Sequence, residues 1–442
     1  MMYVPAQVNT ALELLEAAGF EAFLVGGSVR DYVRENKRGS DWDITTNALP
    51  EETKRIFTGY RLIETGLKHG TVTVVIDGEP LEITTYRIDG SYSDHRRPDS
   101  VCFTGSLRDD VERRDFTMNA LAYNPRTGIV DLVGGVKDIE HNILRCVGDP
   151  DRRFQEDALR ILRALRFASV LGLTFDPKTA AAAHRNKDLL TSVAAERVQI
   201  ELTKLLCGAG VEAILQDFSD VLAVVLPEII PMFGFDQKNP HHDRDVWMHT
   251  VSVVGHTPPL GQLRWTALLH DIGKPHCFSE GSDGFGHFYG HAAGSTAIAD
   301  TVLQRLRFDN ASRERILLLI KHHDSPLPTD EGGIKRLLSR FGEEAARQLI
   351  CLHRADVTAQ HPDFAHRLAD LDSAEVLLDK VLEAEACLSL KDLAIKGGDL
   401  TSAGLRGKAV GAALSAALEA VMDGALPNEK QPLLEYALSL GL

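Results

Sequence analysis

Short apolar runs separated by polar turns fill the first 145 residues, and this pattern predicts a domain that mixes helices with strands. Residues 12–18 have helical spacing, and the apolar run 23–25 predicts a short buried strand. Residues 26–28, Gly-Gly-Ser, predict a tight turn whose backbone N–H groups can approach a ligand closely. A helix is expected to open at residues 29–33.

Two further apolar runs, 72–76 and 81–86, predict strands, and the Asp-Gly pair at 77–78 is a hairpin signal between them. Residues 88–101 are rich in Asp, Ser, Arg and Gly, and they predict a long mobile loop. From about Arg153 the apolar spacing becomes helical and stays so to the end of the chain. The pattern therefore predicts an α/β N-terminal part followed by an all-α remainder.

Two aspartates, Asp41 and Asp43, follow the glycine turn. Residues two apart in a strand point to the same side, so both carboxylates are expected to project together. Such a pair can hold Mg²⁺, which prefers oxygen ligands, and Glu82 in the run 81–86 adds a third acid. An isolated pair of this kind is more often a solvated loop, but the glycine turn and Glu82 favour a metal site. A phosphate-binding turn beside paired carboxylates is typical of two-metal nucleotidyl transfer.

Paired arginines, Arg113 and Arg114, open the run RRDFTMNA. Guanidinium groups form fixed forks that suit triphosphate oxygens, and the amide of Asn119, a donor and an acceptor, suits a ribose hydroxyl. The alternative is a surface basic pair at an ordinary helix start, which this run alone would favour.

The run EDALR places Asp157 and Arg160 one turn apart on an expected helix, so they share a face. The carboxylate offers acceptors and the guanidinium offers donors, which together can pair with a base edge. The alternative is a plain salt bridge between Glu156 and Arg160 on the helix surface.

Several histidines of the second half stand beside aspartates. Because imidazole and carboxylate together suit a divalent transition metal or Mg²⁺, these residues are candidate ligands. The set consists of His249, His270, Asp271, His291, His323 and Asp356. Neighbours on a helix point about 100° apart, so only one of His322 and His323 is expected to face such a site. Buried histidines are also common as packing residues.

The motifs GGSVRD, SDWDITTNALPEE, LEITTYR and RRDFTMNALAYNP occur in this order, and they resemble the class II tRNA nucleotidyltransferases. These are bacterial CCA-adding enzymes of the polymerase β-like nucleotidyltransferase superfamily. The resemblance is close over residues 20 to about 205 and looser beyond. It implies an α+β fold with a nucleotidyltransferase head, a mixed sheet with helices, followed by an all-α neck, body and tail. The expected domains are a head at 1–145, a neck at 146–208, a body at 209–365 and a tRNA-binding tail at 366–442.

The resemblance also implies site residues. Asp41, Asp43 and Glu82 would be catalytic, with Mg²⁺ on the two aspartates. E-D-x-x-R is the amino-acid template that selects CTP and ATP in that family, and the motif beginning Glu196-Arg197 would brace it. The loop starting at Arg87 matches the loop implied in the switch from C to A addition. Nucleotide-binding residues would be Gly26, Gly27, Ser28, Arg30, Arg114, Asp115, Asn119, Asp157, Arg160, Arg163 and Arg166.

The histidine set resembles the HD phosphohydrolase superfamily. This resemblance implies a minimal metal set of His249, His270, Asp271 and Asp356, with a second ion on His291 and His323. The implied ion is Mn²⁺, Ni²⁺, Fe²⁺ or Mg²⁺. Such a domain would add phosphohydrolase activity, or its histidines and aspartates would have only a structural role in the packing of the body.

Net charge is −15, which argues against a broad RNA-binding surface. Residues 146–208 alone are net positive, with 10 basic and 8 acidic residues, so contact with tRNA is expected on a local basic face. Six scattered cysteines without a C-x-x-C pair, and the lack of a signal pattern or membrane-length apolar run, predict a cytoplasmic protein without a membrane partner.

Three functions remain open on the sequence. The first is CCA addition to tRNA from CTP and ATP. The second is an A-adding, CC-adding or poly(A)-polymerase-type enzyme; the full-length loop argues against CC-only addition, and the lack of a long basic C-terminal extension argues against the poly(A) branch. The third is an HD metal phosphohydrolase whose head only binds RNA, which the head motifs argue against.

Overall fold

The computed structural model describes residues 2–37, 39, 41–90, 100–239, 243–282, 284–384 and 386–441. These residues form two compact units, Met1–Pro227 and Glu228–Leu442. The predicted order, a mixed α/β head followed by helices, is confirmed. The boundaries proposed at 145, 208 and 365 stay predictions. No described helix is both long enough and apolar enough to cross a membrane.

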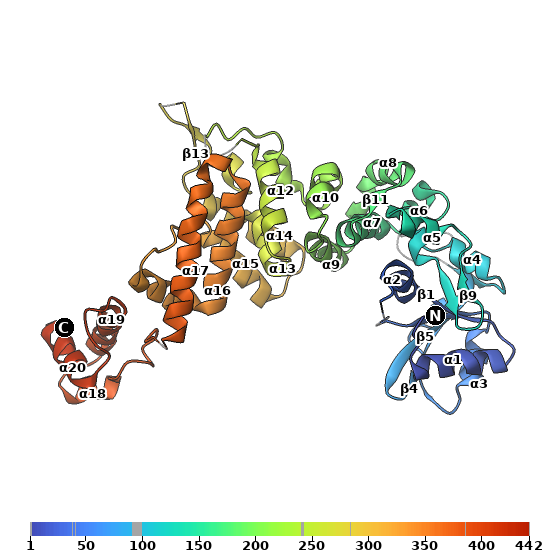
Figure 1. The fold of residues 1–442 in the computed structure, drawn as a ribbon, viewed down its shortest axis with the longest axis horizontal. Coiled ribbons are helices and arrows are strands. Elements are labelled where there is room, and N and C mark those ends of the chain that lie inside the picture. Colours follow the sequence, from blue (N-terminus) through green and yellow to red (C-terminus); the bar gives the residue numbers. More distant parts are fainter. Residues whose placement is uncertain are drawn as a thin grey trace. The chain divides into compact units, whose positions relative to one another are not determined.

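The described part of the first unit contains a seven-stranded mixed sheet in the order β3-β4-β5-β2-β1-β8-β9 (Figure 1). Strands β2 and β5 run parallel, and the other neighbouring pairs run antiparallel. Alternate residues of β4 face the core, which is the period-two burial that a half-covered sheet requires. The strands are β1 (Ala22–Val25), β2 (Asp43–Thr46), β3 (Arg61–Ile63), β4 (Thr71–Ile76), β5 (Glu79–Thr85), β8 (Ala122–Asn124) and β9 (Gly128–Val130).

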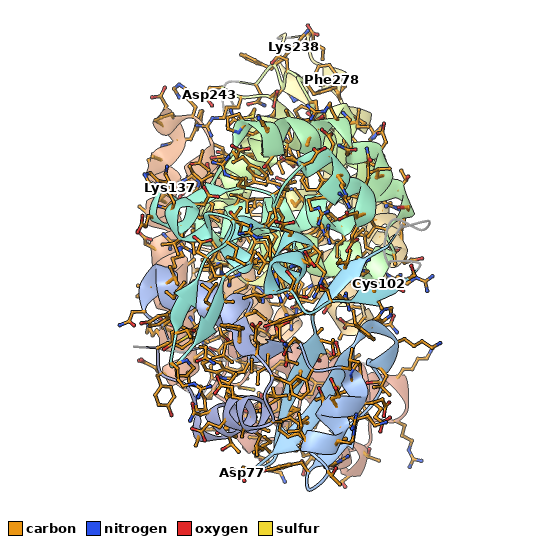
Figure 2. All side chains as sticks on the ribbon, turned by 90° about the vertical axis from the view of Figure 1, so that its right-hand side faces the viewer. Asp77, Cys102, Lys137, Lys238, Asp243 and Phe278 are labelled. Carbon is orange, nitrogen blue, oxygen red and sulfur yellow. The ribbon has the colours of Figure 1, made fainter. Side chains whose placement is uncertain are left out.

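The predicted hairpin joins β4 to β5. Asp77 and Gly78 have φ angles of 51° and 86°, as a type I′ turn requires at both central positions. Asp77, labelled in Figure 2, lies at this turn. The positive φ angles of this turn therefore fix the register of the hairpin, and the register sets the position of Glu82 in the sheet.

Helices complete the first unit. They are α1 (Ala6–Ala17), α2 (Gly27–Glu35), α3 (Pro50–Ile56), α4 (Leu107–Glu112), α5 (Gly135–Glu140), α6 (Pro150–Glu156), α7 (Leu159–Leu171), α8 (Pro177–Arg185), α9 (Ala195–Leu206), α10 (Val211–Asp217) and α11 (Ser219–Val225). Short 3₁₀ turns are η1 (Leu67–His69), η2 (Thr117–Asn119) and η3 (Lys187–Ser192). Helix α2 begins at Gly27, so the glycine turn is shorter than the predicted 26–28.

Two small strand pairs lie outside the main sheet. Strands β6 (Arg87–Asp89) and β7 (Val101–Phe103) pair antiparallel at the two ends of the predicted loop, and residues 91–99 of that loop lie outside the described residues. Strands β10 (Ile143–Leu144) and β11 (Thr174–Phe175) pair parallel, so the segment after Arg153 is not wholly helical. Each pair is too short to change the predicted fold class.

The second unit is helical in its described residues apart from the antiparallel pair β12 (Ser279–Glu280) and β13 (Gly286–His287). Helices α16 and α17 lie side by side (Figure 1) and share an apolar cluster that includes Ile350 and Leu378. The elements are η4 (Pro227–Met232), α12 (Val246–His256), α13 (Gly261–Leu269), η5 (Lys274–His276), α14 (His291–Arg305), α15 (Asn310–His322), α16 (Glu331–Ala359), η6 (Pro362–Arg367), α17 (Leu368–Glu383), α18 (Gly397–Ser402), α19 (Lys408–Met422) and α20 (Lys430–Ser439).

Candidate active site and metal centre

A cavity of about 470 Å³ opens in the first unit where α2, β2, η2 and α7 converge. It gathers many of the head residues predicted from the sequence, including both members of the arginine pair Arg113 and Arg114, and it adds Phe167. Ser28, Asp41 and Glu82 do not line it. The predicted residues that do are Gly26, Gly27, Arg30, Asp43, Arg114, Asp115, Asn119, Asp157, Arg160, Arg163 and Arg166.

Gly26 brings the start of α2 against β2. Its φ of +79° is a backbone conformation that favours glycine, and a Cβ at this position would lie 3.3 Å from Asp43 Oδ2. Both the backbone angle and the close approach therefore select glycine. The Asp43 carboxylate consequently sits beside backbone that can approach a phosphate.

Asp43 is the first residue of β2, and its register partner on the parallel strand β5 is Glu82. Burial, and then the negative charges of Asp41 and Glu82, raise the pKa of Asp43 to about 6. The carboxylate of Asp43 therefore lies near two other negative charges, those of Asp41 and Glu82. A cation bound there would relieve their mutual repulsion.

Asp41 lies outside the strand. Since β2 begins at Asp43, the prediction that both aspartates project from one strand is wrong for Asp41, which is exposed. Its backbone carbonyl accepts a hydrogen bond from the Ser28 hydroxyl, which ties it to α2. Among the described residues, the carboxylates of Asp41, Asp43 and Glu82 do not come together within 4.8 Å as a three-ligand group.

Asp110 on α4 is buried and forms ion pairs with both arginines of the RRDFTMNA run, Arg113 and Arg114. Its Oδ1 accepts from Arg113 Nη2 at 2.7 Å and its Oδ2 accepts from Arg114 Nη2 at 3.1 Å. Thr45 of β2 also donates to Oδ2, at 3.1 Å. Sequence reasoning missed Asp110, because nothing in the sequence indicates that α4 packs against β2.

Asp110→Ala is expected to lower the free energy of unfolding by about 3–5 kcal/mol, because it leaves two largely buried guanidinium groups without their shared carboxylate. Chemical denaturation measures this change. Glu112→Ala on the same helix is the matched control: its side chain is 54% exposed, and a change within about 0.5 kcal/mol is expected. Equal effects of the two variants would contradict the role given to Asp110.

Asp115 and Asn119 form a hydrogen-bonded network across the cavity. Asp115 Oδ2 accepts from Arg163 Nη2 at 2.6 Å, its Oδ1 accepts from Asn119 Nδ2 at 3.1 Å, and Asn119 Oδ1 accepts from Arg30 Nη1 at 2.9 Å. Burial alone would raise the pKa of Asp115, but the charge and hydrogen bonds of Arg163 lower it to about 2. The network therefore fixes α2, η2 and α7 around one charged centre.

Phe167 lies under three guanidinium groups. The Cζ atoms of Arg166, Arg30 and Arg163 lie 4.0, 5.2 and 5.5 Å from its ring centroid, which is within cation–π range. The aromatic face helps to hold three like charges close together at the cavity. One aromatic residue on an arginine-rich helix carries no sequence signal for this arrangement.

Asp157 does not share a helix with Arg160. Helix α6 ends at Glu156 and α7 begins at Leu159, so Asp157 lies in extended backbone between them, where Oδ1 accepts from Leu159 N at 3.1 Å. The predicted common helix is therefore wrong, because Asp157 serves the start of α7 instead. Both side chains still line the cavity.

Other residues also form hydrogen bonds with Asp157 and Arg160. Glu156 Oε2 accepts from Arg160 Nη1 at 2.7 Å, and the carbonyl of Arg113 accepts from Arg160 Nη2 at 3.3 Å. Arg197 of α9 donates to Asp157 Oδ2 at 3.2 Å. Helix α9 therefore contacts the segment between α6 and α7 directly, through Arg197 and Asp157.

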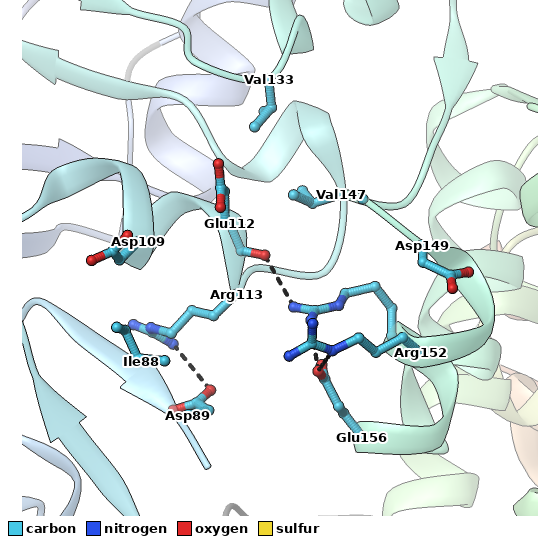
Figure 3. Close-up of a pocket in the computed structure, with 12 residues that line it drawn as sticks. Ile88, Asp89, Asp109, Glu112, Arg113, Val133, Val147, Asp149, Arg152 and Glu156 are labelled. Atoms are coloured by element: carbon cyan, nitrogen blue, oxygen red, sulfur yellow. Dashed lines mark hydrogen bonds and ion pairs between the residues drawn. The ribbon is translucent and has the colours of Figure 1, made fainter. Parts of the chain in front are cut away.

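A second cavity of about 490 Å³ lies on the other side of Arg113 (Figure 3). In Figure 3, Arg113 points toward Asp89, and Arg152 points toward Glu156. Arg153 also pairs with Glu156, at 2.6 Å. Five carboxylates and three guanidinium groups line this space, so its lining is net negative. Such a lining repels a triphosphate, so the first cavity is the better candidate for a nucleotide site.

The candidate ligands of the second unit converge. Two groups have all their ligand atoms within 4.8 Å of one another: His249, His270 and Asp271, and Asp271, His291 and His323. Asp356 joins the first group, with Oδ1 3.0 Å from His249 Nε2 and 3.8 Å from His270 Nε2. Asp271 belongs to both groups, and a carboxylate in this position can bridge two ions.

Three of these imidazoles are oriented by the backbone. Nδ1 of His270, His291 and His323 lies 2.7, 2.9 and 2.7 Å from the carbonyl oxygen three residues earlier. A carbonyl can only accept, so Nδ1 carries the proton and Nε2 is left to bind a cation. The ring of His322 lies beside Phe341 instead, with centroids 4.8 Å apart and the planes tilted by 58°, as the helix geometry predicts for one of the adjacent pair.

Asp271 is fully buried in this cluster. Burial alone would raise its pKa, but the charges of His270 and Lys274 hold the pKa of Asp271 well below its usual range. Lys274 Nζ lies 2.7 Å from Asp271 Oδ2. The residues present therefore fit a divalent metal centre with an ionised bridging carboxylate.

Three sequence families match consecutive parts of the chain. Residues 22–145 match the poly A polymerase head domain, residues 172–232 match the probable RNA- and SrmB-binding site of polymerase A, and residues 293–437 match tRNA nucleotidyltransferase domain 2. The order of these matches follows the order of head and helical segments in the structure.

Whole-length relatives agree with these matches. The CCA-adding enzyme of Lacticaseibacillus paracasei is 36% identical over 97% of this chain and 95% of its own length, and that of Lactobacillus helveticus is 34% identical over 96% and 94%. The Bacillus stearothermophilus CCA-adding enzyme, solved in complex with CTP, has a TM-score of 0.74 and 27% identity over 98% of this chain and 97% of that one. Similarity of this degree along nearly the whole of both proteins shows that the chain belongs to the family of CCA-adding enzymes.

Proposed function

We propose that this protein adds CCA to the 3′ end of tRNA, taking CTP and ATP without a nucleic-acid template. The observation that carries the proposal is the head cavity, in which Asp43, Asp157 and Arg160 line the same space. An acidic group for metal-assisted transfer and a donor–acceptor pair for base selection would thus face one nucleotide bound in this cavity.

Asp43 and Asp41, with Glu82 beside them, are the residues that would hold Mg²⁺ in the head. When bound, the ion would neutralise triphosphate charge and favour attack by the tRNA 3′-hydroxyl on the α-phosphate. The raised pKa of Asp43 supports this assignment: burial, and then the negative charges of Asp41 and Glu82, raise it to about 6, and a bound cation would favour the ionised carboxylate.

The basic side chains of the head cavity would bind and orient the nucleotide. Arg114, fixed by Asp110, and the guanidinium groups over Phe167 present positive charge to the triphosphate. Asn119 is held by Asp115 and Arg30 within reach of a ribose. The Asp157 carboxylate and Arg160 guanidinium then offer the acceptor and donor for the Watson–Crick edge of cytosine or adenine.

The test uses tRNA ending at the discriminator base, at C or at CC, incubated with CTP, ATP or both. CCA addition extends each substrate to the same end and then stops. Extension of the CC substrate alone indicates an A-adding enzyme, termination at CC indicates a CC-adding enzyme, and continued growth in ATP indicates poly(A) synthesis. No extension of any substrate would contradict nucleotidyl transfer altogether.

Arg160→Ala is expected to reduce the preference for CTP and ATP over UTP and GTP by roughly ten- to a hundredfold, since base-edge hydrogen bonds contribute about 1–3 kcal/mol of discrimination. Competition between labelled nucleotides measures the ratio. Arg185→Ala, an exposed arginine paired with Asp151, is the matched control and should keep the ratio. If Arg160→Ala keeps the wild-type nucleotide choice, Arg160 does not select the base and only forms a salt bridge with Glu156.

A second function is favoured by the cluster around Asp271. We infer that His249, His270, Asp271 and Asp356 would hold one divalent ion and that His291 and His323, with Asp271, would hold a second. Such ions supply a hydroxide near neutral pH for hydrolysis of phosphoesters when bound. The support is the common Nδ1–carbonyl orientation, which leaves the ring Nε2 atoms turned toward one carboxylate.

A further inference from the structure

The Glu156 carboxylate connects the two cavities of the first unit. Glu156 lines the second cavity, whereas its partner Arg160 lines the first. Its two oxygens have different partners: Oε2 accepts from Arg160 Nη1 at 2.7 Å, and Oε1 accepts from Arg153 Nη2 at 2.6 Å. One carboxylate therefore joins an arginine of α6 to an arginine of α7. The position of the Arg160 guanidinium thus depends on what holds the other oxygen of Glu156.

Two arginines approach that other oxygen, and the protein buries only one of them. The side chain of Arg153 is 7% exposed, whereas that of Arg152, whose Nε lies 3.2 Å from the same Oε1, is 71% exposed (Figure 3). A short, buried, charge-assisted hydrogen bond contributes far more than an exposed ion pair that solvent screens. Arg153, rather than Arg152, therefore fixes the Glu156 carboxylate.

Arg153 is itself held by the end of α4. Its Nη1 donates to the carbonyl of Glu112 at 3.1 Å, and the next carbonyl, that of Arg113, accepts from Arg160 Nη2 at 3.3 Å. The last carbonyls of a helix have no partner within the helix, and the helix dipole favours cations beside them. Two guanidinium groups therefore share the end of α4, with the Glu156 carboxylate between them.

The contacts of Arg160 fix the plane of its guanidinium. Its Nη1 donates to Glu156 and also to the carbonyl of Arg153, at 3.1 Å, while Nη2 donates to the carbonyl of Arg113. Because a guanidinium is planar, contacts at two of its nitrogens set its orientation as well as its position. Hydrogen bonds to a base edge depend on direction, so a tilted guanidinium would distinguish cytosine and adenine from uracil and guanine less well.

We propose that Arg153 is a positioning residue for base selection, which holds Glu156 and thereby sets the plane of the Arg160 guanidinium. The inference rests on the selection of CTP and ATP by Asp157 and Arg160 proposed above. It adds to that selection a residue that lines the second cavity and acts on the nucleotide only through Glu156 and Arg160.

The triphosphate contacts proposed for the head cavity are fixed by other residues. Arg114 is held by Asp110, and Arg163 is held by Asp115. Replacement of Arg153 removes neither ion pair, so nucleotide binding and nucleotide choice are expected to separate. The KM for CTP should stay within about threefold of the wild-type value while discrimination between bases falls.

Competition between labelled nucleotides on tRNA ending at the discriminator base or at CC measures this discrimination. Arg153→Met removes the guanidinium, and it is expected to lower the preference for CTP and ATP over UTP and GTP by roughly five- to twentyfold. Arg153→Lys should recover part of the preference, since an ammonium keeps the charge but not the planar fork. Arg152→Ala is the matched control: it removes the exposed partner of the same oxygen and should keep the wild-type preference. The ratio is measured within one sample, so it does not depend on the fraction of a variant that is folded.

The double variant Arg153→Met/Arg160→Ala decides whether Arg153 acts through Arg160. If it does, Arg153→Met should cause no further loss of preference in the Arg160→Ala background, because residues that act through one another are not additive. A further loss as large as that in the wild-type background would overturn the proposal. A wild-type preference in Arg153→Met, or an equal loss in Arg152→Ala, would also overturn it. A wild-type preference in Arg160→Ala would instead remove the proposed selection by Arg160, and with it the role of Arg153.

Discussion

Asp43→Ala is expected to lower nucleotide incorporation by roughly a thousandfold or more while tRNA binding is retained, because losing a metal ligand removes several kcal/mol of transition-state stabilisation. Primer-extension rates under single-turnover conditions measure the first quantity, and fluorescence anisotropy with labelled tRNA measures the second. Asp41→Ala is expected to behave in the same way, although Asp41 lies outside β2.

Glu79→Ala is the matched control for this prediction. Glu79 begins β5, the strand that carries Glu82, and it is exposed. Its replacement removes a carboxylate from the same strand without touching the cavity, so incorporation should stay near the wild-type rate. Near-normal incorporation by Asp43→Ala would contradict the assignment of this carboxylate to a catalytic metal.

His270→Ala is expected to abolish divalent metal binding at the first group of the second unit and to lower any metal-dependent phosphoester hydrolysis by roughly a thousandfold or more. CCA addition should be largely retained, because the head cavity and this cluster use separate residues on separate units. Elemental analysis after incubation with Mn²⁺ or Ni²⁺, followed by phosphatase assays, measures both effects.

Two further variants control for folding and position. Asp356→Asn removes a carboxylate from the same ion and should lose metal in parallel, even if His270→Ala, at a fully buried position, proves unstable. His322→Ala changes the histidine whose ring lies beside Phe341, and metal content should stay at the wild-type level. If the wild-type protein binds no ion under these conditions, the histidine cluster has only a packing role.

Local signals account for the parts of the fold that the sequence predicts well. An apolar run followed by paired glycines predicts β1 and the start of α2, and an Asp-Gly pair predicts the β4–β5 hairpin, because each signal depends on neighbouring residues alone. The histidine cluster is predicted as a set since its spacing resembles a known constellation. That Asp271 belongs to both groups of candidate ligands emerges only when the helices are packed together.

Residues that act through long-range packing could not be predicted. Asp110 matters because α4 meets β2, and Phe167 because three guanidinium groups from two helices gather over one ring. The sequence predicts Asp157 on a helix, because no glycine or proline marks the break after Glu156. Each of these outcomes depends on tertiary contacts that override local pattern.

The strand order of the head also constrains how the chain can fold as it is synthesised. Strand β1, which leads into Gly26, lies between β2 and β8, and Leu24 pairs with Tyr123. Long loop closure makes such a pairing late and slow. The ribosome must therefore release the chain beyond residue 123 before this side of β1 is covered, and until then its unpaired edge is open to other chains and to chaperones.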